Sequence, residues 1–179
     1  MRKLLSVIAL LACTSVAFAQ MSKIPQRNEI VQIDINDGLR ELEIFNSPKD
    51  GENHYYLSLG RLMFGDQIVQ VRIDPISELF IPLGNTLEES ANTLAKFQDI
   101  FKSDPGTSVE IEGCVRVGIP KEDDFEPVTV TYRKVLVSKQ LEFSVKRGDY
   151  MSSADVGKSD LASLVNTFKL YRKTHRKQP

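Results

Sequence analysis

The stretch TLEESANTLAKFQDIFKSDPG, Thr86 to Gly106, has the clearest local pattern in the chain and decides its fold class. Thr86 followed by Glu89 is the pattern of a capping box, in which each side chain accepts a hydrogen bond from the other residue's backbone N–H. Apolar residues then recur with the helical period, at Leu87, Ala91, Leu94, the Phe97-Gln98 position and Phe101. Pro105 cannot continue a helix and Gly106 allows a turn, so the stretch predicts a helix over about 86–103.

Upstream of this helix, apolar and polar residues alternate with the two-residue period of half-buried strands. The alternation predicts strands over 30–35, 39–45, 54–59, 67–73 and 79–83. Asn36-Asp37-Gly38 separates the first two. Asp-Gly between apolar runs is a strong hairpin signal, because Gly accepts the positive φ of a tight turn. We therefore expect neighbouring strands to pair antiparallel.

Downstream of the helix, apolar residues occupy odd positions from Val109 to Ile119, with Gly113 among them. This pattern predicts a long strand with one buried face. Cys114 falls on the even positions, together with glutamate and arginine residues. We therefore expect Cys114 on the wetter face of the sheet.

The next apolar residues form two sets, 128–132 and 135–137, that are out of phase with each other. A phase change of this kind, here at Arg133-Lys134, is typical of a bulge or a sheet corner. Residues 141–145 alternate again and predict the last strand. Residues 150–158 are polar and predict a loop.

The final apolar pattern predicts a second helix over about 159–174. Ser159 is placed to cap it, and Asp160 in the first turn complements the helix dipole. Its apolar stripe consists of Leu161, Leu164, Val165, Phe168 and Tyr171. Together these elements predict an α+β fold, a mainly antiparallel sheet of about seven or eight strands packed with two helices.

The N-terminus has the pattern of a secretory signal. Arg2-Lys3 precedes about ten apolar residues, a run too short for a membrane span, which needs about 20. No later stretch is apolar enough to span. Ala17-Phe18-Ala19 predicts cleavage after Ala19, which leaves Gln20 as the mature N-terminus. Leu10-Leu11-Ala12-Cys13 keeps an alternative open, a lipobox in which Cys13 is acylated and anchors the protein.

The chain divides into a signal peptide at 1–19, a flexible segment at 20–28, one α+β domain at 29–174 and a basic tail at 175–179. Loss of Arg2 and Lys3 leaves 21 basic against 24 acidic residues. A surface this close to neutral has no field that favours nucleic acid, so we expect no nucleic-acid partner. Once Cys13 is removed, Cys114 stands alone, so the fold rests on its core and not on disulfides.

Residues that carry common catalytic or metal chemistry are sparse. The two histidines, His54 and His175, share no local signature with Cys114. Patterns such as G-x-S-x-G, C-x-x-C, H-E-x-x-H and the EF-hand loop are absent from the sequence. The acidic run 121–126 lacks the ligand spacing of a calcium loop. We expect no catalytic residue, metal or cofactor; paired Asp and Glu residues on a concave sheet face remain the one open enzymatic alternative.

Two segments are candidates for contact with a ligand or partner. The first is an apolar row between Gly60 and Gly65, which forms either a contact loop or a crossing that tucks into the core; it consists of Leu62, Met63 and Phe64. The second is the basic end of the C-terminal helix, with Arg172, Lys173, Arg176 and Lys177. These cations either complement the helix dipole or contact an anionic surface such as lipid headgroups or lipopolysaccharide.

The signal ending Ala-Phe-Ala-Gln, followed by a short α+β domain, resembles the small exported proteins of Bacteroidetes, a group with no assigned function. The stretch IPLGNTLEE, Ile81 to Glu89, is similar to the loop-to-helix transition of such chains. The resemblance implies a layout and carries over no functional residue.

We expect an exported, non-enzymatic binding or accessory domain of the cell envelope, periplasmic or secreted. Its partner would be an envelope protein or an anionic surface ligand. The alternatives are a small hydrolase that uses Asp and Glu residues, and a component of an envelope complex that is lipid-anchored at Cys13.

Overall fold

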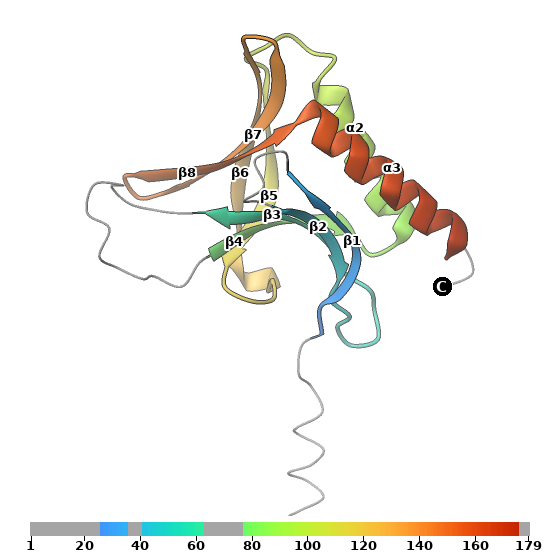
Figure 1. Ribbon diagram of the computed structural model, residues 1–179. Helices are drawn as coiled ribbons and strands as arrows, with labels where there is room; N and C mark the ends of the chain where they lie inside the picture. Colours follow the sequence, from blue (N-terminus) through green and yellow to red (C-terminus); the bar gives the residue numbers. More distant parts are fainter. Residues whose placement is uncertain (1–25, 36–40, 63–76, 176–179) are drawn as a thin grey trace, which may run out of the picture.

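The computed structural model describes residues 26–35, 41–62 and 77–175. Within these ranges eight strands form one sheet, and two α-helices pack against it (Figure 1). The strands lie side by side in chain order, and each is antiparallel to its neighbours. The predicted α+β fold is therefore confirmed.

The first half of the sheet consists of β1 (Asn28–Asp34), β2 (Glu41–Asn46), β3 (Tyr55–Leu62) and β4 (Ser77–Gly84). The second half consists of β5 (Ser108–Arg116), β6 (Phe125–Val135), β7 (Ser138–Arg147) and β8 (Tyr150–Gly157). Helix α2 (Leu87–Ile100) connects the two halves, and helix α3 (Lys158–Thr174) follows β8. A short 3₁₀ helix, Glu122–Asp124, precedes β6.

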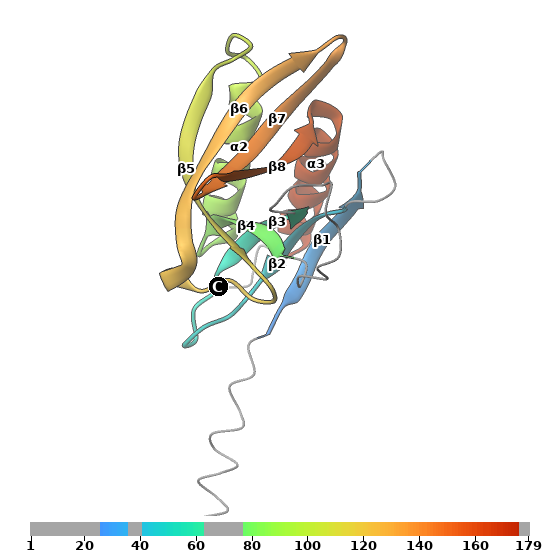
Figure 2. The same ribbon diagram turned by 90° about the vertical axis from the view of Figure 1, so that its left-hand side faces the viewer.

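The sheet bends so strongly that β8 lies against β3, although four strands separate them in the sheet order (Figure 1). Helix α3 packs against β1, β7, β8 and α2, and so covers the side left open between the first and last strands (Figure 2). The concave side is filled by apolar side chains such as Leu57, Phe143 and Phe168, each at most 1% exposed. Neither described helix is long and apolar enough to cross a membrane.

The N-terminus of α2 has the predicted capping box. The Glu89 N–H donates to Thr86 Oγ1 at 3.1 Å, and the Thr86 N–H donates to Glu89 Oε2 at 3.2 Å. Leu94 and Phe97 are buried against the sheet. The helix ends at Ile100, three residues before the expected end.

The predicted loop over 150–158 is wrong, because residues 150–157 form β8 and Lys158 begins α3. Ser152, Ala154 and Val156 point inward and are buried. Ser152 and Ala154 are small, and Ser152 is polar, so the alternation between inward and outward residues shows little difference in hydrophobicity. The prediction that Ser159 caps the second helix is also wrong. Since β8 runs straight into α3, Gly157 occupies the N-cap position, and no side chain caps it.

The predicted bulge at Arg133-Lys134 is wrong as well. Val135 pairs with Ser138, so Leu136 and Val137 form the two-residue turn of a hairpin between β6 and β7. The phase changes because the chain reverses direction there. The turn contains no Gly, Asn, Asp or Pro, so it has none of the usual turn signals.

The expected wet environment of Cys114 is wrong. Its side chain is fully buried in a second, smaller apolar cluster that also contains Phe45, Tyr56 and Phe80. The alternation placed Cys114 correctly on the face opposite Val115. That face is not solvated at this point, because the three aromatic side chains cover it.

Several expectations fall outside the described residues. They are the signal peptide with Cys13, the start at Gln20, the turn at 36–38, the side chains of Met63 and Phe64, the strand over 67–73, and Arg176 and Lys177.

Candidate binding groove

The described parts of the two sequence-predicted contact segments, Leu62 and Arg172-Lys173, lie apart. Leu62 is the last residue of β3, where its backbone pairs with Ser77. Figure 1 shows β3 ending on the opposite side of the molecule from the C-terminal end of α3. In that helix, Arg172 is held by Glu88 of α2 at 2.5 Å, between Nη2 and Oε2, while Lys173 is exposed. Arg172 therefore links the two helices.

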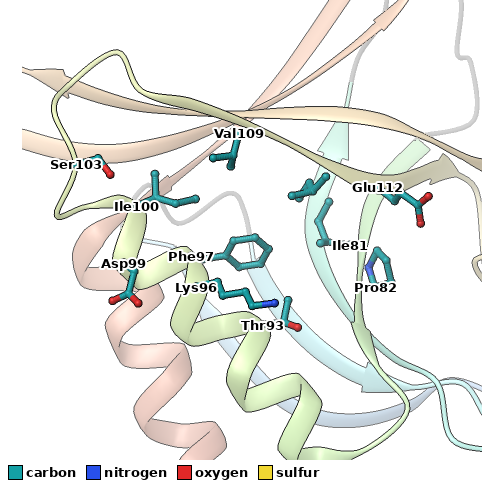
Figure 3. A pocket seen from close by; sticks show the side chains of 11 residues that line it. Ile81, Pro82, Thr93, Lys96, Phe97, Asp99, Ile100, Ser103, Val109 and Glu112 are labelled. Atoms are coloured by element: carbon teal, nitrogen blue, oxygen red, sulfur yellow. The ribbon is translucent and has the colours of Figure 1, made fainter.

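A different feature is the gap between β4 and β5. Their ladder has three paired positions and ends at Phe80 opposite Cys114. Beyond that pair the two strands diverge, with α2 on one side of the gap and β5 on the other (Figure 3). Gly113 stands where they separate. A Cβ there would lie 2.5 Å from Val128 Cγ2 and 3.0 Å from Ile81 Cδ1, so only glycine permits the close crossing.

The gap opens into a groove of about 640 Å³, which we call the α2–β5 groove. Its apolar lining comes from β4, α2 and β5 and consists of Ile81, Pro82, Phe97, Ile100, Val109 and Ile111. Its polar lining consists of Thr93, Lys96, Asp99, Ser103 and Glu112. The groove is thus an apolar trough with side chains of both charge signs along it.

One wall of the groove is an open strand edge. Along 108–114, β5 pairs with β6 on its other side. Toward β4, positions 109–113 have no strand partner among the described residues. Backbone N–H and C=O groups on an unpaired edge are a ready template for another strand. The facing edge of β4 is less suitable for pairing with an added strand, because Pro82 has no N–H to donate.

The carboxylates of the groove do not form a pair. Figure 3 shows Asp99 and Glu112 at opposite ends of the trough. The large core, to which Ile81 and Phe97 of the groove belong, is apolar and contains no buried Asp or Glu residue among the described ones. No group of three or more His, Cys, Asp or Glu residues in the described ranges is placed to hold a metal ion.

Arg27 covers the second, smaller apolar cluster, the one that contains Cys114. Its guanidinium carbon lies 4.4 Å from the centre of the Phe45 ring and 5.6 Å from that of Phe80. The same guanidinium binds Glu43, and its Nη1 donates to Glu78 Oε2 at 3.0 Å. The cluster beneath is closed, so we assign it a structural role.

Cys114 inside that cluster is not a nucleophile. Burial raises the pKa of its thiol, and Asp124 and Glu126 raise it further against the opposing effects of the Lys121 backbone and Arg116. A buried, protonated thiol is inert because the thiolate is the reactive form. His54 follows the β2–β3 turn, and His175 stacks on Tyr171 with ring centres 3.9 Å apart.

Sequence reasoning missed the α2–β5 groove, although two residues carried a signal for it. Pro82 lies inside a strand, which is typical of an edge. Gly113 interrupts another strand, and such a glycine marks a close approach of two backbones. The chain matches no family model, no curated protein and no solved structure, so its function has to be inferred from its own residues.

Proposed function

We propose that this protein is an exported, non-enzymatic binding domain that holds an extended polypeptide segment in the α2–β5 groove. The observation that carries this proposal is the end of the β4–β5 ladder at Phe80. It leaves the edge of β5 beside an apolar trough. The N-terminal pattern with Ala17-Phe18-Ala19 supports export.

The two features of the groove match the two requirements of strand addition. Main-chain hydrogen bonds to an open edge supply affinity for any extended peptide, and pockets for alternate side chains supply specificity. Here Val109 and Ile111 lie two residues apart on β5 and line the trough together with Phe97 and Ile100 of α2. A bound strand would place every second side chain among them and the intervening ones toward solvent.

The proposal can be tested with a library of linear random peptides displayed on phage and panned against the immobilised mature domain. We expect enriched sequences that alternate apolar and polar residues. Synthetic versions of them should bind in calorimetry with micromolar dissociation constants. Enrichment of peptides without alternation, or no enrichment above bare support, would contradict strand addition.

Matched variants locate the binding. Val109 lines the groove and is 38% exposed, whereas Val117 follows β5 outside the groove and is 52% exposed. Val109→Lys puts a charge into the apolar trough and should weaken an enriched peptide about tenfold or more, the equivalent of about 1.4 kcal/mol. Val117→Lys should leave the affinity unchanged. Equal affinities for the two variants would place the peptide elsewhere.

A further inference from the structure

The hairpin between β6 and β7 ends in an apolar turn at one extremity of the molecule. We call residues 134–139 the β6–β7 tip. Val135, Leu136 and Val137 are 52%, 89% and 94% exposed, the last two being the most exposed large apolar side chains among the described residues. Figures 1 and 2 both show this hairpin reaching one end of the fold, away from β4.

The backbone of the β6–β7 tip is unfavourable for the residue it carries. Leu136 has a φ of +55°, a left-handed conformation that bulky side chains rarely adopt. Of the two central turn residues, only Leu136 has a positive φ, which matches a type II′ turn. That turn favours glycine at this position. The chain instead places a large apolar side chain there and points it into solvent.

The charges of the β6–β7 tip are also arranged against the stability of the hairpin. Lys134 and Lys139 are directly opposite each other across the two strands. Like charges in that position destabilise a sheet. Neither lysine has an ion pair to another described residue, whereas Arg133, one step further from the turn, is neutralised by Glu142 at 2.6 Å. Val137 and Lys139 of the tip line a hollow that also contains Asp155, Asp160 and Lys158.

We propose that the β6–β7 tip inserts Leu136 and Val137 into the surface of a bilayer that carries anionic lipid, with Lys134 and Lys139 at the headgroup phosphates. Apolar side chains that sink below the headgroups leave water, and each lysine close to an anionic leaflet adds electrostatic attraction. A narrow, convex projection fits a fluid interface. It does not offer the broad, flat apolar patch on which protein partners pack.

This proposal is independent of the α2–β5 groove, because the two sites share no residue. The test is cosedimentation of the mature domain with vesicles of phosphatidylcholine, alone or mixed with phosphatidylglycerol. The wild type should sediment with the mixed vesicles, less so as salt rises, and stay in solution with the neutral ones. A wild type that stays in solution with both, or binds both equally, overturns the proposal.

Leu136→Asn separates binding from folding. Asn accepts a positive φ, so the melting temperature should stay the same or rise. Vesicle affinity should fall on the order of tenfold or more, because one exposed leucine no longer leaves water. Leu170→Asn is the matched control, since Leu170 is 63% exposed on α3. It should bind like the wild type; equal binding by Leu136→Asn would overturn the proposal.

The lysines are tested by Lys134→Gln and Lys139→Gln. Each change should weaken binding to the mixed vesicles about fivefold, and the double variant should lose most of the salt dependence. Removing two like charges from opposing positions should also raise hairpin stability. Unchanged affinity of the double variant for the mixed vesicles would rule out the headgroup contact.

Discussion

Gly113 and Cys114 are adjacent in β5 but belong to different faces of the sheet. Gly113 lies against Ile81 and Val128, which belong to the large core, and Cys114 lies in the smaller outer cluster. Gly113 has no room for a Cβ, and the Cys114 side chain is fully buried. Substitutions at these two positions therefore test the two faces separately.

Gly113→Ala should lower the free energy of unfolding by about 1–3 kcal/mol, because its Cβ would overlap the Val128 side chain. Urea denaturation of both proteins measures the difference. The check on this cause is a double-mutant cycle with Val128→Ala, in which removing the Val128 methyl groups should recover part of the loss. Strictly additive effects would mean that the two residues do not clash.

Cys114 should make the protein less stable in alkali. Burial raises the pKa of the thiol in the folded protein above its ordinary value. The folded state therefore holds this proton more tightly than the unfolded state. The resulting stability is fully present below the unfolded pKa and is lost as the pH rises through the folded pKa.

The measurement is urea denaturation at about pH 8 and about pH 10.5, on either side of the unfolded thiol pKa of about 8.5. Tyr55, whose pKa burial also raises, contributes in the same direction in both proteins. Cys114→Ala should lose less stability between the two pH values than the wild type does. An equal loss in both would contradict the assignment to Cys114.

Among the helices and strands, α2 was predicted from the sequence and β8 was missed. The signal of α2 is local, because Thr86 and Glu89 cap it from three residues apart. β8 has no such signal, since its inward-facing Ser152 and Ala154 are small, and their burial comes with the packing of β8 against β3 and α3. The turn at Leu136 was missed because it has the wrong residue for its φ.

The α2–β5 groove could not be predicted, because its existence depends on where the β4–β5 ladder ends. Periodicity placed Val109 and Ile111 on the buried face of a strand and predicted an extended segment over 79–83. It says nothing about which strands stay paired along their full length. The end of this pairing at residues 80 and 114 is a property of the folded sheet.

Thr86→Ala should lower the free energy of unfolding by about 1 kcal/mol, because the Glu89 N–H loses its acceptor. Thr167→Ala on α3 is a suitable control, since Thr167 is exposed and its hydroxyl only donates back to Ser163 O. Alanine is the better helix former, so that variant should be neutral or slightly more stable. Urea denaturation compares both with the wild type. Equal losses in the two variants would remove the capping box as the cause.

At the scale of the whole molecule, the described fold is closed by α3. The helix packs on β1 at one end of the strand order and on β8 at the other, and Arg172 ties it to α2. Its apolar stripe was fully predicted, with Leu161, Leu164 and Phe168 at most 1% exposed. The bend that brings β8 onto β3 was not, because sheet curvature arises from contacts between distant strands.

Export should leave a mature chain that begins at Gln20. Intact mass spectrometry of the protein made in a Gram-negative host, with its N-terminal segment complete, measures this directly. Cys13→Ser should not change the mass of the mature chain if cleavage follows Ala19. A mature chain that starts at a lipid-modified Cys13, and a loss of membrane attachment in Cys13→Ser, would favour the anchored alternative.

The identity of strand order and chain order has a consequence for how the protein reaches its native state. Each of the eight described strands pairs with the strand that precedes or follows it in the chain, so none has to wait for a partner that is synthesised later than its successor. A chain that emerges N-terminus first, from a ribosome or an export channel, can add each strand to the growing sheet as it appears. Pairing between strands that follow one another along the chain keeps the paired residues close in sequence, which favours rapid folding. The packing of α3 on β1 instead joins the last described helix to the first described strand, so it can form only after both have been synthesised.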